Sequence, residues 1–167
     1  MLPQQTPEFS GFQIAAHSSP AIAVGGDFYD FIPLGQERLG VVVGDAVGHG
    51  IAAALLMTMT LTDFRSIAPR ETAAAAVLNS INRRLAQGMR TRKFVTSIYA
   101  VLDRANHRLT CAMGGMQPWL VKAKSGECVP IEPPGARFPL GASGKSVYQS
   151  CDIEMERGDA LVFFTDG

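Results

Sequence analysis

Residues 39–56 read LGVVVGDAVGHGIAAALL, and this stretch decides the fold because its pattern changes in the middle. Leu39–Gly44 is a continuous apolar run, typical of a strand that is buried on both faces. Ile51–Ala68 is rich in Ala, Leu and Met with apolar residues near helical spacing, and Pro69 ends it. Asp45 stands between the two, followed by small residues and two glycines. The stretch therefore predicts a strand, an acidic glycine-containing turn and a helix.

The rest of the chain separates into β-like and helical blocks. Glu71–Gln87 repeats the helical pattern, and Gly88 suits the position just after a helix. Turn sequences at Asp103–Asn106 and Ser125-Gly126 divide the second half into hairpins. Further strands are predicted at Phe12–Ala16, Asp27–Ile32, Val95–Leu102, Leu109–Met113, Val147–Met155 and Ala160–Phe164. Because three strands, two helices and then at least five strands form separate blocks, we expect an α+β fold with mainly antiparallel sheets.

Composition and charge narrow the class of protein. The 167 residues fit one domain, and 47% hydrophobic with 18% charged residues is ordinary for a compact soluble chain. Fifteen basic and fifteen acidic residues balance, so no overall field points to nucleic acid or a membrane surface. Cys111, Cys128 and Cys151 are odd in number and widely spaced, which argues against a disulfide framework or a zinc site. With no membrane-span-like run and no signal-like N-terminus, the chain is expected to be cytoplasmic.

Three aspartates stand beside glycine at the ends of, or within, β-like runs, namely Asp27, Asp45 and Asp166. The strand–turn–strand between Asp27 and Asp45 is of a length that brings both carboxylates to the same end of a sheet. Convergent carboxylates, with the Ala46 carbonyl beside Asp45, suit hard divalent cations because these prefer oxygen ligands. Two such ions about 3.5–4 Å apart would activate a water for attack on a phosphomonoester.

Simpler roles for single residues stay open at this point. Asp45 taken alone also fits a helix cap or a turn. Asp30 is expected to face another way from Asp27, in a structural or supporting role. His49, in the loop after Asp45, suits contact with solvent, substrate or phosphate and equally no catalytic role. No strand-borne Ser or Cys nucleophile stands in a pattern with a His partner.

At these motifs the chain resembles the bacterial metal-dependent protein serine/threonine phosphatases of the PPM (PP2C-like) superfamily. The most similar branch is that of the sporulation and stress-response regulators that act on anti-sigma factor antagonists. The resemblance covers nearly the whole chain, through the blocks Leu2-Pro3-Gln4 with Pro7, Pro20-Ala21, Val24–Asp30, Gly44–Gly50, Ala52–Met57, Pro139-Leu140-Gly141, Gly158-Asp159 and Thr165-Asp166-Gly167.

The resemblance implies a fold, a metal site and a substrate. The fold would be two packed, mainly antiparallel sheets flanked by helix pairs. Asp45 would bridge two metal ions and Ala46 would contribute its carbonyl, while Asp27 and Asp166 would each bind or orient one metal and its waters. The ions would be Mn²⁺ or Mg²⁺, and the substrate a phosphoserine or phosphothreonine on a small protein of the anti-sigma factor antagonist type.

Two departures from the family pattern affect these expectations. Where the branch commonly has Ala-Gly-His-Asn-Pro, residues 114–118 read Gly-Gly-Met-Gln-Pro, so the role of Met116-Gln117 stays open. The sequence ends at Asp166-Gly167, whereas the family pattern continues to a final strand and an Asp-Asp pair. We therefore expect residues 1–167 to be a single, C-terminally incomplete PPM-type domain excised from a larger regulator with an upstream sensor. Alone, it is expected to be weakly active or inactive, and its unpaired sheet edges favour association, for example as a homodimer.

Other functions compete with a metal-dependent phosphatase. A HAD-type phosphatase is disfavoured because Phe164 stands where that family needs its nucleophilic aspartate. A catalytically inactive signalling module that binds a phosphorylated partner is favoured by the Met116-Gln117 departure and opposed by the three retained acids. The helix Ile51–Ala68 either simply packs on the core or shifts the Asp45 backbone and so gates metal occupancy.

Overall fold

The apolar run after residue 38 becomes the second strand of a five-stranded antiparallel sheet. The computed structural model describes residues 2–19, 25–88 and 93–165. Within them the elements follow in the order β1 (Asp27–Pro33), β2 (Arg38–Ala46), α1 (Gly50–Ile67), the 3-10 helix η1 (Ala68–Arg70), α2 (Ala74–Gly88), β3 (Val95–Asp103), β4 (Arg108–Gly114), β5 (Trp119–Val121), β6 (Cys128–Pro130), β7 (Ser150–Ile153) and β8 (Ala160–Val162). The larger sheet has the order β1-β2-β3-β4-β7, and a three-stranded sheet has the order β6-β5-β8. Every strand pair in both sheets is antiparallel, as the sequence predicted.

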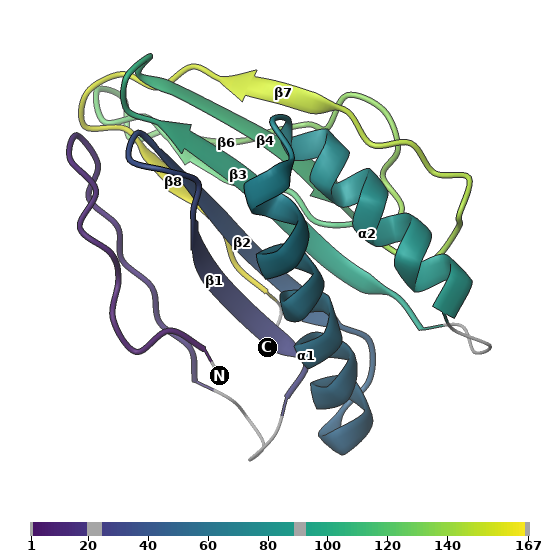
Figure 1. Cartoon of the computed structure of the whole chain (residues 1–167). Coiled ribbons are helices and arrows are strands. Elements are labelled where there is room, and N and C mark those ends of the chain that lie inside the picture. Colours follow the sequence, from purple (N-terminus) through teal and green to yellow (C-terminus); the bar gives the residue numbers. More distant parts are fainter. Residues whose placement is uncertain (1, 20–24, 89–92, 166–167) are drawn as a thin grey trace.

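The larger sheet is the middle of three layers. In Figure 1, α1 and α2 lie together across one of its faces. There Val42 of β2 and Phe64 of α1 belong to one buried cluster. On the opposite face, Val41 of β2 and Leu120 of β5 belong to a second cluster, which lies between the two sheets. Because successive residues of a strand point to opposite faces, a strand covered on both sides must be apolar throughout, which explains the run in β2.

α1 is the longer of the two helices and packs one side on the sheet. Its buried residues recur at helical spacing and include Leu56, Leu61 and Phe64. Pro69 lies in the short η1 helix that follows, where its missing N–H removes no bond from α1. The span Gly50–Arg70 is the one helix in the described part of the chain that is long and apolar enough to cross a membrane. Core helices pass the same test, and the contacts of α1 with the sheet are those of a core helix.

An ion pair ties α1 to β1. Arg65 Nε donates to Asp30 Oδ2 at 2.6 Å, and the Asp30 side chain is only 6% exposed. The other carboxylate oxygen of Asp30 accepts a hydrogen bond from the backbone N–H of Phe31 at 3.0 Å. Asp30 lies three residues after Asp27 in the same strand, so it projects from the opposite face of the sheet. The structural role expected for Asp30 is therefore confirmed.

Three predicted strands differ from the structure. Residues 12–16 form no strand, because Phe12 makes only an isolated bridge to Phe9 and the segment has no ladder partner among the described residues. The strand predicted at 147–155 shortens to β7, because the backbone of Tyr148 bonds instead to the Asn79 side chain of α2 at 2.9 and 3.0 Å. The strand predicted at 160–164 shortens to β8, since its partner β5 is only three residues long.

Candidate metal centre at the ends of β1 and β2

The ends of β1 and β2 place two of the predicted carboxylates directly opposite each other. Asp27 and Asp45 are register partners in this antiparallel pair. Residues directly opposite each other project from the same face of a sheet. Thr96 of β3 is the partner of Asp45 on its other side, and its hydroxyl oxygen lies 3.5 Å from the Asp45 carbonyl oxygen. A row of three polar residues therefore crosses three strands, on the face that is turned toward the smaller sheet.

Gly26 allows oxygen atoms to approach the start of β1 closely. A Cβ atom at Gly26 would lie 2.3 Å from the Ala46 carbonyl oxygen and 2.8 Å from Asp45 Oδ1. Both distances are shorter than any ordinary Cβ contact, so only glycine fits here. The Gly26 carbonyl accepts a hydrogen bond from the Ala46 N–H at 3.1 Å, which fixes this approach. The two oxygen groups that the sequence assigned to a metal, from Asp45 and Ala46, thus converge above Gly26.

The Asp27 carboxylate has one buried oxygen without a hydrogen-bond partner. Asp27 Oδ1 is inaccessible to solvent and accepts no hydrogen bond in the described structure. A buried carboxylate oxygen without a partner is costly, and the Asp45 carboxylate directly opposite adds repulsion between like charges. A divalent cation between the two strand ends offsets both costs. The residues present therefore fit the kind of metal that the sequence predicted, with an all-oxygen donor set.

Backbone pairing from distant segments holds this end of the sheet. Ala46 is the register partner of Val95 at the start of β3. Val95 in turn exchanges two backbone hydrogen bonds with Leu140, of 2.9 and 2.8 Å. The next residue, Gly141, donates its N–H to the buried Asn82 side chain of α2 at 2.8 Å. The Pro-Leu-Gly block around Leu140 thus has a structural role, because it fixes the strand end that carries Ala46.

The loop between Asp45 and α1 needs glycine at two positions. Gly48 and Gly50 have φ values of +100° and +69°, which side-chain-bearing residues rarely adopt. His49 lies between them as the N-cap residue of α1, and its side chain makes no capping hydrogen bond. Asp45 belongs to β2 and does not occupy the cap position. The alternative in which Asp45 only caps the helix is therefore wrong.

The third predicted acid, Asp166, lies outside the described residues. Within the described ranges, no three His, Cys, Asp or Glu side chains gather closely enough to hold a metal ion. Phe163, in the segment after β8, packs against the cluster between the two sheets. That cluster lies on the same side of the larger sheet as Asp27 and Asp45. A role for Asp166 at the metal remains a prediction.

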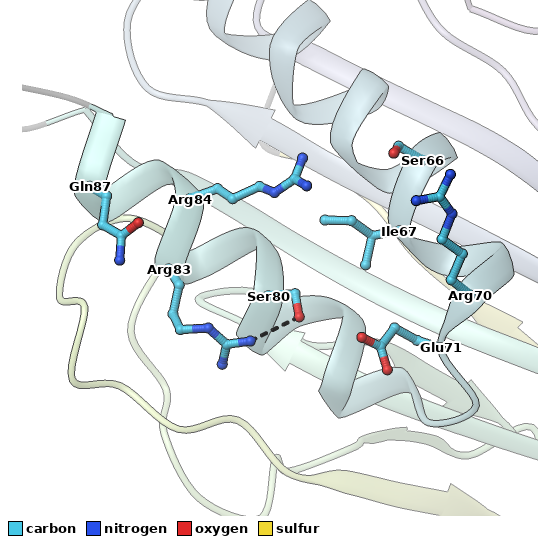
Figure 2. Close-up of a pocket in the computed structure, with 8 residues that line it drawn as sticks. All are labelled: Ser66, Ile67, Arg70, Glu71, Ser80, Arg83, Arg84 and Gln87. Carbon is cyan, nitrogen blue, oxygen red and sulfur yellow. Dashed lines mark hydrogen bonds between the residues drawn. The ribbon is translucent and has the colours of Figure 1, made fainter.

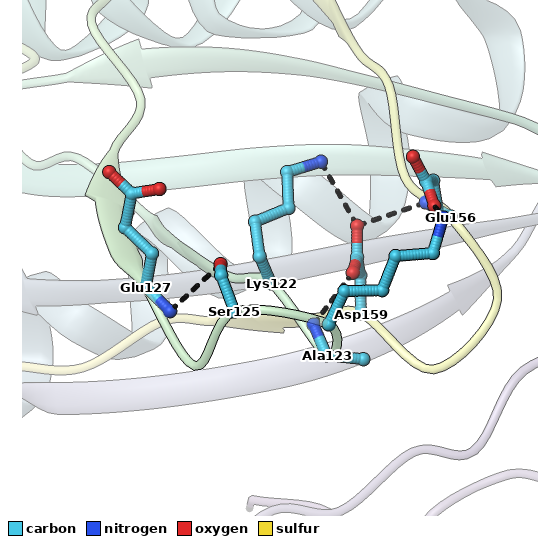
Figure 3. A network of polar contacts seen from close by, with 7 residues as sticks. Lys122, Ala123, Ser125, Glu127, Glu156 and Asp159 are labelled. Carbon is cyan, nitrogen blue, oxygen red and sulfur yellow. Dashed lines mark hydrogen bonds and ion pairs between the residues drawn. The ribbon is translucent and has the colours of Figure 1, made fainter.

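The side chain of Asp159 is only 3% exposed, and its carboxylate has its partners within the protein. Figure 3 shows its carboxylate accepting hydrogen bonds from the Glu156 and Ala123 backbone N–H groups and from Lys122 Nζ, at 3.0, 2.9 and 3.0 Å. These partners, with the Glu156 N–H foremost, lower the pKa of Asp159 to about 2. Asp159 thereby fastens the loop before β8 to the residues that follow β5. Its sequence context, Gly158-Asp159, gave no sign of this difference from the metal-site aspartates.

The helices enclose a separate polar pocket. It has a volume of about 340 Å³ and is lined by Ser66, Ile67, Arg70, Glu71, Ser80, Arg83, Arg84 and Gln87. Figure 2 shows these side chains between the C-terminal end of α1 and the facing side of α2. Arg84 pairs with Asp63 at 2.6 Å, and Arg83 donates to Ser80 at 3.0 Å, so two of the three arginines already have partners. The pocket lies at the opposite end of α1 from Asp45, and a helix of 18 residues is about 27 Å long. It is therefore not part of the candidate metal centre.

Most of the chain matches a known protein family. The family model described as Stage II sporulation protein E (SpoIIE) matches residues 35–167. Phosphoserine phosphatase RsbU of Bacillus subtilis (strain 168) is 30% identical over 168 residues, which cover 100% of this chain and 49% of RsbU. The chain thus spans about half the length of this curated relative.

Solved structures share the fold. The RsbU and RsbW domains of Rv1364c from Mycobacterium tuberculosis match with a TM-score of 0.75 and 31% identity, over 89% of this chain and 41% of that one. The PP2C phosphatase domain of SpoIIE from Bacillus subtilis, solved with a fragment of its regulatory domain, matches with a TM-score of 0.71 and 19% identity, over 86% and 42%. RsbX in complex with magnesium matches with a TM-score of 0.68 and 17% identity, over 87% and 68%. At their low identities, the last two show the fold alone.

Proposed function

Because the chain belongs to the Stage II sporulation protein E (SpoIIE) family, we propose that it hydrolyses phosphoserine or phosphothreonine on a small signalling protein in a metal-dependent reaction. The observation that carries this proposal is the pairing of Asp27 with Asp45 across β1 and β2, with the Ala46 carbonyl beside them. RsbU, to which the chain is similar, is named a phosphoserine phosphatase. The substrate class follows from the resemblance to regulators that act on anti-sigma factor antagonists.

The residues of the chain have distinct tasks in this reaction. The Asp27 and Asp45 carboxylates and the Ala46 carbonyl hold the metal, and Asp166 is proposed as a further ligand. When bound, divalent ions lower the pKa of a water for attack on phosphorus and neutralise charge on the phosphoryl oxygens. Pairing on both sides of β2 holds the backbone of Asp45 and so fixes the position from which its side chain projects. Because Gly26 has no side chain, the space beside the Ala46 carbonyl oxygen and Asp45 Oδ1 stays free of a Cβ atom.

The metal is proposed to be Mn²⁺ or Mg²⁺, with two ions in the complete centre. The donors are carboxylate and carbonyl oxygens, which favour hard cations over soft ones. The structure of RsbX, which has the same fold, was solved in complex with magnesium.

Regulation is proposed to act through α1, which begins four residues after Ala46. Ile51, Leu55 and Met59 follow one another at four-residue spacing and are 75%, 60% and 58% exposed. An upstream sensor segment that covers this apolar stripe would displace the helix start and, through the loop, the backbone of Asp45. A second copy of the chain is the other candidate occupant. We propose that this signalling takes place in the cytoplasm, where free thiols such as the three cysteines are kept reduced. We propose no nucleic-acid or membrane partner, because acidic and basic residues balance.

A catalytically inactive module is the second candidate function. It is favoured by residues 114–118, which read Gly-Gly-Met-Gln-Pro where the branch commonly has Ala-Gly-His-Asn-Pro. Such a module would keep the fold and bind the phosphorylated partner without turning it over.

Phosphate release from p-nitrophenyl phosphate and from a phosphoserine protein, measured against Mn²⁺ concentration, tests the proposal. In a protein extended beyond residue 167, we expect release that saturates with Mn²⁺, stops with a chelator and is lost in Asp45→Asn. Residues 1–167 alone should release phosphate weakly or not at all. Asp152→Asn is the matched control, because Asp152 sits in an exposed ion pair with Arg108 on β4. Hydrolysis that persists in Asp45→Asn would contradict the mechanism. Binding of the phosphoserine protein without hydrolysis and without Mn²⁺ uptake would support the inactive module instead.

A further inference from the structure

Two cysteines that lie 40 residues apart in sequence are neighbours in the larger sheet. Cys111 of β4 and Cys151 of β7 are direct register partners, and their Sγ atoms are 3.6 Å apart. Cys111 is buried and Cys151 is partly buried. Both are free thiols, as is the exposed Cys128 on β6 of the other sheet. The sequence pattern did not indicate this pair, because its two members belong to strands that are not consecutive.

The backbone already has the geometry that a disulfide needs. Residues directly opposite each other in an antiparallel pair have Cα atoms about 4.5–5.5 Å apart, which lies within the range of about 4.4–6.8 Å found for disulfides. The neighbouring pairs Leu109↔Ile153 and Thr110↔Asp152 fix the register on one side of Cys151. The sulfur atoms therefore have to approach by about 1.5 Å to bond, which rotation of the side chains supplies without a change in strand pairing.

We propose that Cys111 and Cys151 form a redox site in which a two-electron oxidant of the peroxide class creates a cross-strand disulfide. The two thiols have different accessibility. Burial, foremost, and the adjacent Cys151 raise the pKa of the Cys111 thiol, so this thiol stays protonated and shielded. Cys151 is the partly exposed member and lies on β7, the edge strand of the sheet. The oxidant therefore reaches Cys151 first.

The reaction balances in two steps. In the first, Cys151 Sγ attacks one peroxide oxygen, the O–O bond breaks, and the products are a sulfenic acid on Cys151 and one water, which carries the thiol proton. In the second, Cys111 Sγ attacks the sulfenyl sulfur, the S–S bond forms, the S–O bond breaks, and a second water leaves with the Cys111 proton. The thiols lose two electrons and two protons in total, and the peroxide is reduced to two waters.

The disulfide between Cys111 and Cys151 would link β7, a short edge strand, covalently to β4. β7 has four residues and pairs with β4 on one side only. The segment after it runs through the Asp159 loop into β8, the last strand before Asp166. Oxidation would therefore restrict the connection between the two sheets and close a covalent loop in the unfolded chain. The redox site does not rest on the proposed phosphatase activity, and its test needs no substrate.

Intact mass and thiol counting on the Cys128→Ser protein test the proposal, because only the pair then remains. After limited hydrogen peroxide treatment, we expect the mass to fall by two hydrogens and the thiol count under denaturing conditions to fall from two to none. Dithiothreitol should restore both values. No disulfide should form between chains, as judged by a non-reducing denaturing gel, and the thermal midpoint should rise by about 5–10 °C.

Two further variants test the reactivity of each cysteine in the absence of the other. In Cys128→Ser/Cys111→Ala, Cys151 should accumulate a sulfenic acid that a dimedone probe captures, with circular dichroism confirming that the protein is folded. In Cys128→Ser/Cys151→Ala, Cys111 should stay reduced. Three results would each overturn the proposal. The Cys128→Ser protein could keep both thiols after treatment, it could gain oxygen on Cys151 without losing the Cys111 thiol, or it could form a disulfide between chains.

Discussion

Asp27 and Asp159 follow a glycine in the same way, yet their surroundings are opposite. The Asp159 carboxylate accepts three hydrogen bonds from within the protein and fastens a loop. Asp27 has a buried oxygen without a partner and faces a second carboxylate, Asp45, across the strand pair. The Asp159 carboxylate is satisfied by donors of the protein, whereas a buried oxygen of Asp27 accepts no hydrogen bond and is available to a cation. A Gly-Asp pair therefore has no fixed meaning, and the number of donors around the carboxylate decides between a structural and a metal-binding role.

The largest expected effect is the loss of catalysis when Asp45, the proposed metal ligand opposite Asp27, is replaced. Asp45→Asn should lower Mn²⁺-dependent phosphatase activity on the order of 1000-fold, because a neutral amide is a poor ligand for a hard cation. The fold should be retained, as measured by circular dichroism, because asparagine has nearly the same size and shape as aspartate. A comparable loss in Asp152→Asn would show that surface charge, and not the metal centre, controls the activity.

The next effect concerns the space above Gly26. Gly26→Ala should weaken Mn²⁺ binding by about 10–100-fold, because its Cβ would come within 2.3 Å of the Ala46 carbonyl oxygen and 2.8 Å of Asp45 Oδ1. Gly25→Ala is a matched control, since its Cβ would meet no atom closer than 3.9 Å. Calorimetric titration of both proteins with Mn²⁺ provides the measurement. Equal Mn²⁺ affinities in the two variants would show that the absence of a side chain at Gly26 does not matter for metal binding.

A change from aspartate to asparagine should alter stability in opposite directions at the two sites. In metal-free protein, Asp27→Asn should raise the free energy of unfolding by roughly 0.5 kcal/mol, because it removes repulsion from Asp45. Asp159→Asn should lower the thermal midpoint by several degrees, because its amide group cannot accept bonds from all three donors. Thermal unfolding in the presence of a chelator measures both. A loss of stability in both variants would erase the contrast between the two sites.

The smallest effect is on acid stability. Because the pKa of Asp159 is lowered from 3.8 to about 2 in the folded protein, the unfolded chain binds its proton more readily. The stabilisation is therefore complete above about pH 5 and is lost as the pH falls from about 4 to about 2. Acid unfolding of the wild type should show this loss, and in Asp159→Asn the curve should be flatter over the same interval. Parallel curves would mean that other carboxylates dominate acid unfolding.

The sequence predicted the architecture where patterning is strong. The change from a β-like run to a helical pattern at Asp45 located β2 and α1, and the separate blocks indicated an α+β fold with antiparallel sheets. The resemblance to PP2C-like phosphatases of the sporulation and stress-response branch is confirmed by the SpoIIE family match and by the shared fold. The proximity of Asp27 and Asp45 was also predictable, because the strand–turn–strand that separates them by 18 positions does place them opposite each other. Their binding of a metal remains a prediction.

What the sequence did not predict depends on contacts between distant segments. Alternation at residues 12–16 resembled a strand, but a strand needs a neighbour with free backbone groups, and no described residues supply one. The register of β4 with β7 decides that Cys111 meets Cys151. The bonds from Lys122 and Ala123 decide that Asp159 is structural. None of these pairings leaves a local signal, because each joins segments more than 30 residues apart.

The most direct test of the metal centre is a titration of the chain with Mn²⁺, followed by electron paramagnetic resonance of the free ion, for wild type, Asp27→Asn and Asp159→Asn. The pairing of Asp27 with Asp45 predicts that wild type and Asp159→Asn take up Mn²⁺ while Asp27→Asn takes up at least tenfold less at the same concentration. Equal uptake by wild type and Asp27→Asn would contradict the claim that the Asp27 carboxylate, whose buried Oδ1 accepts no hydrogen bond, holds a cation.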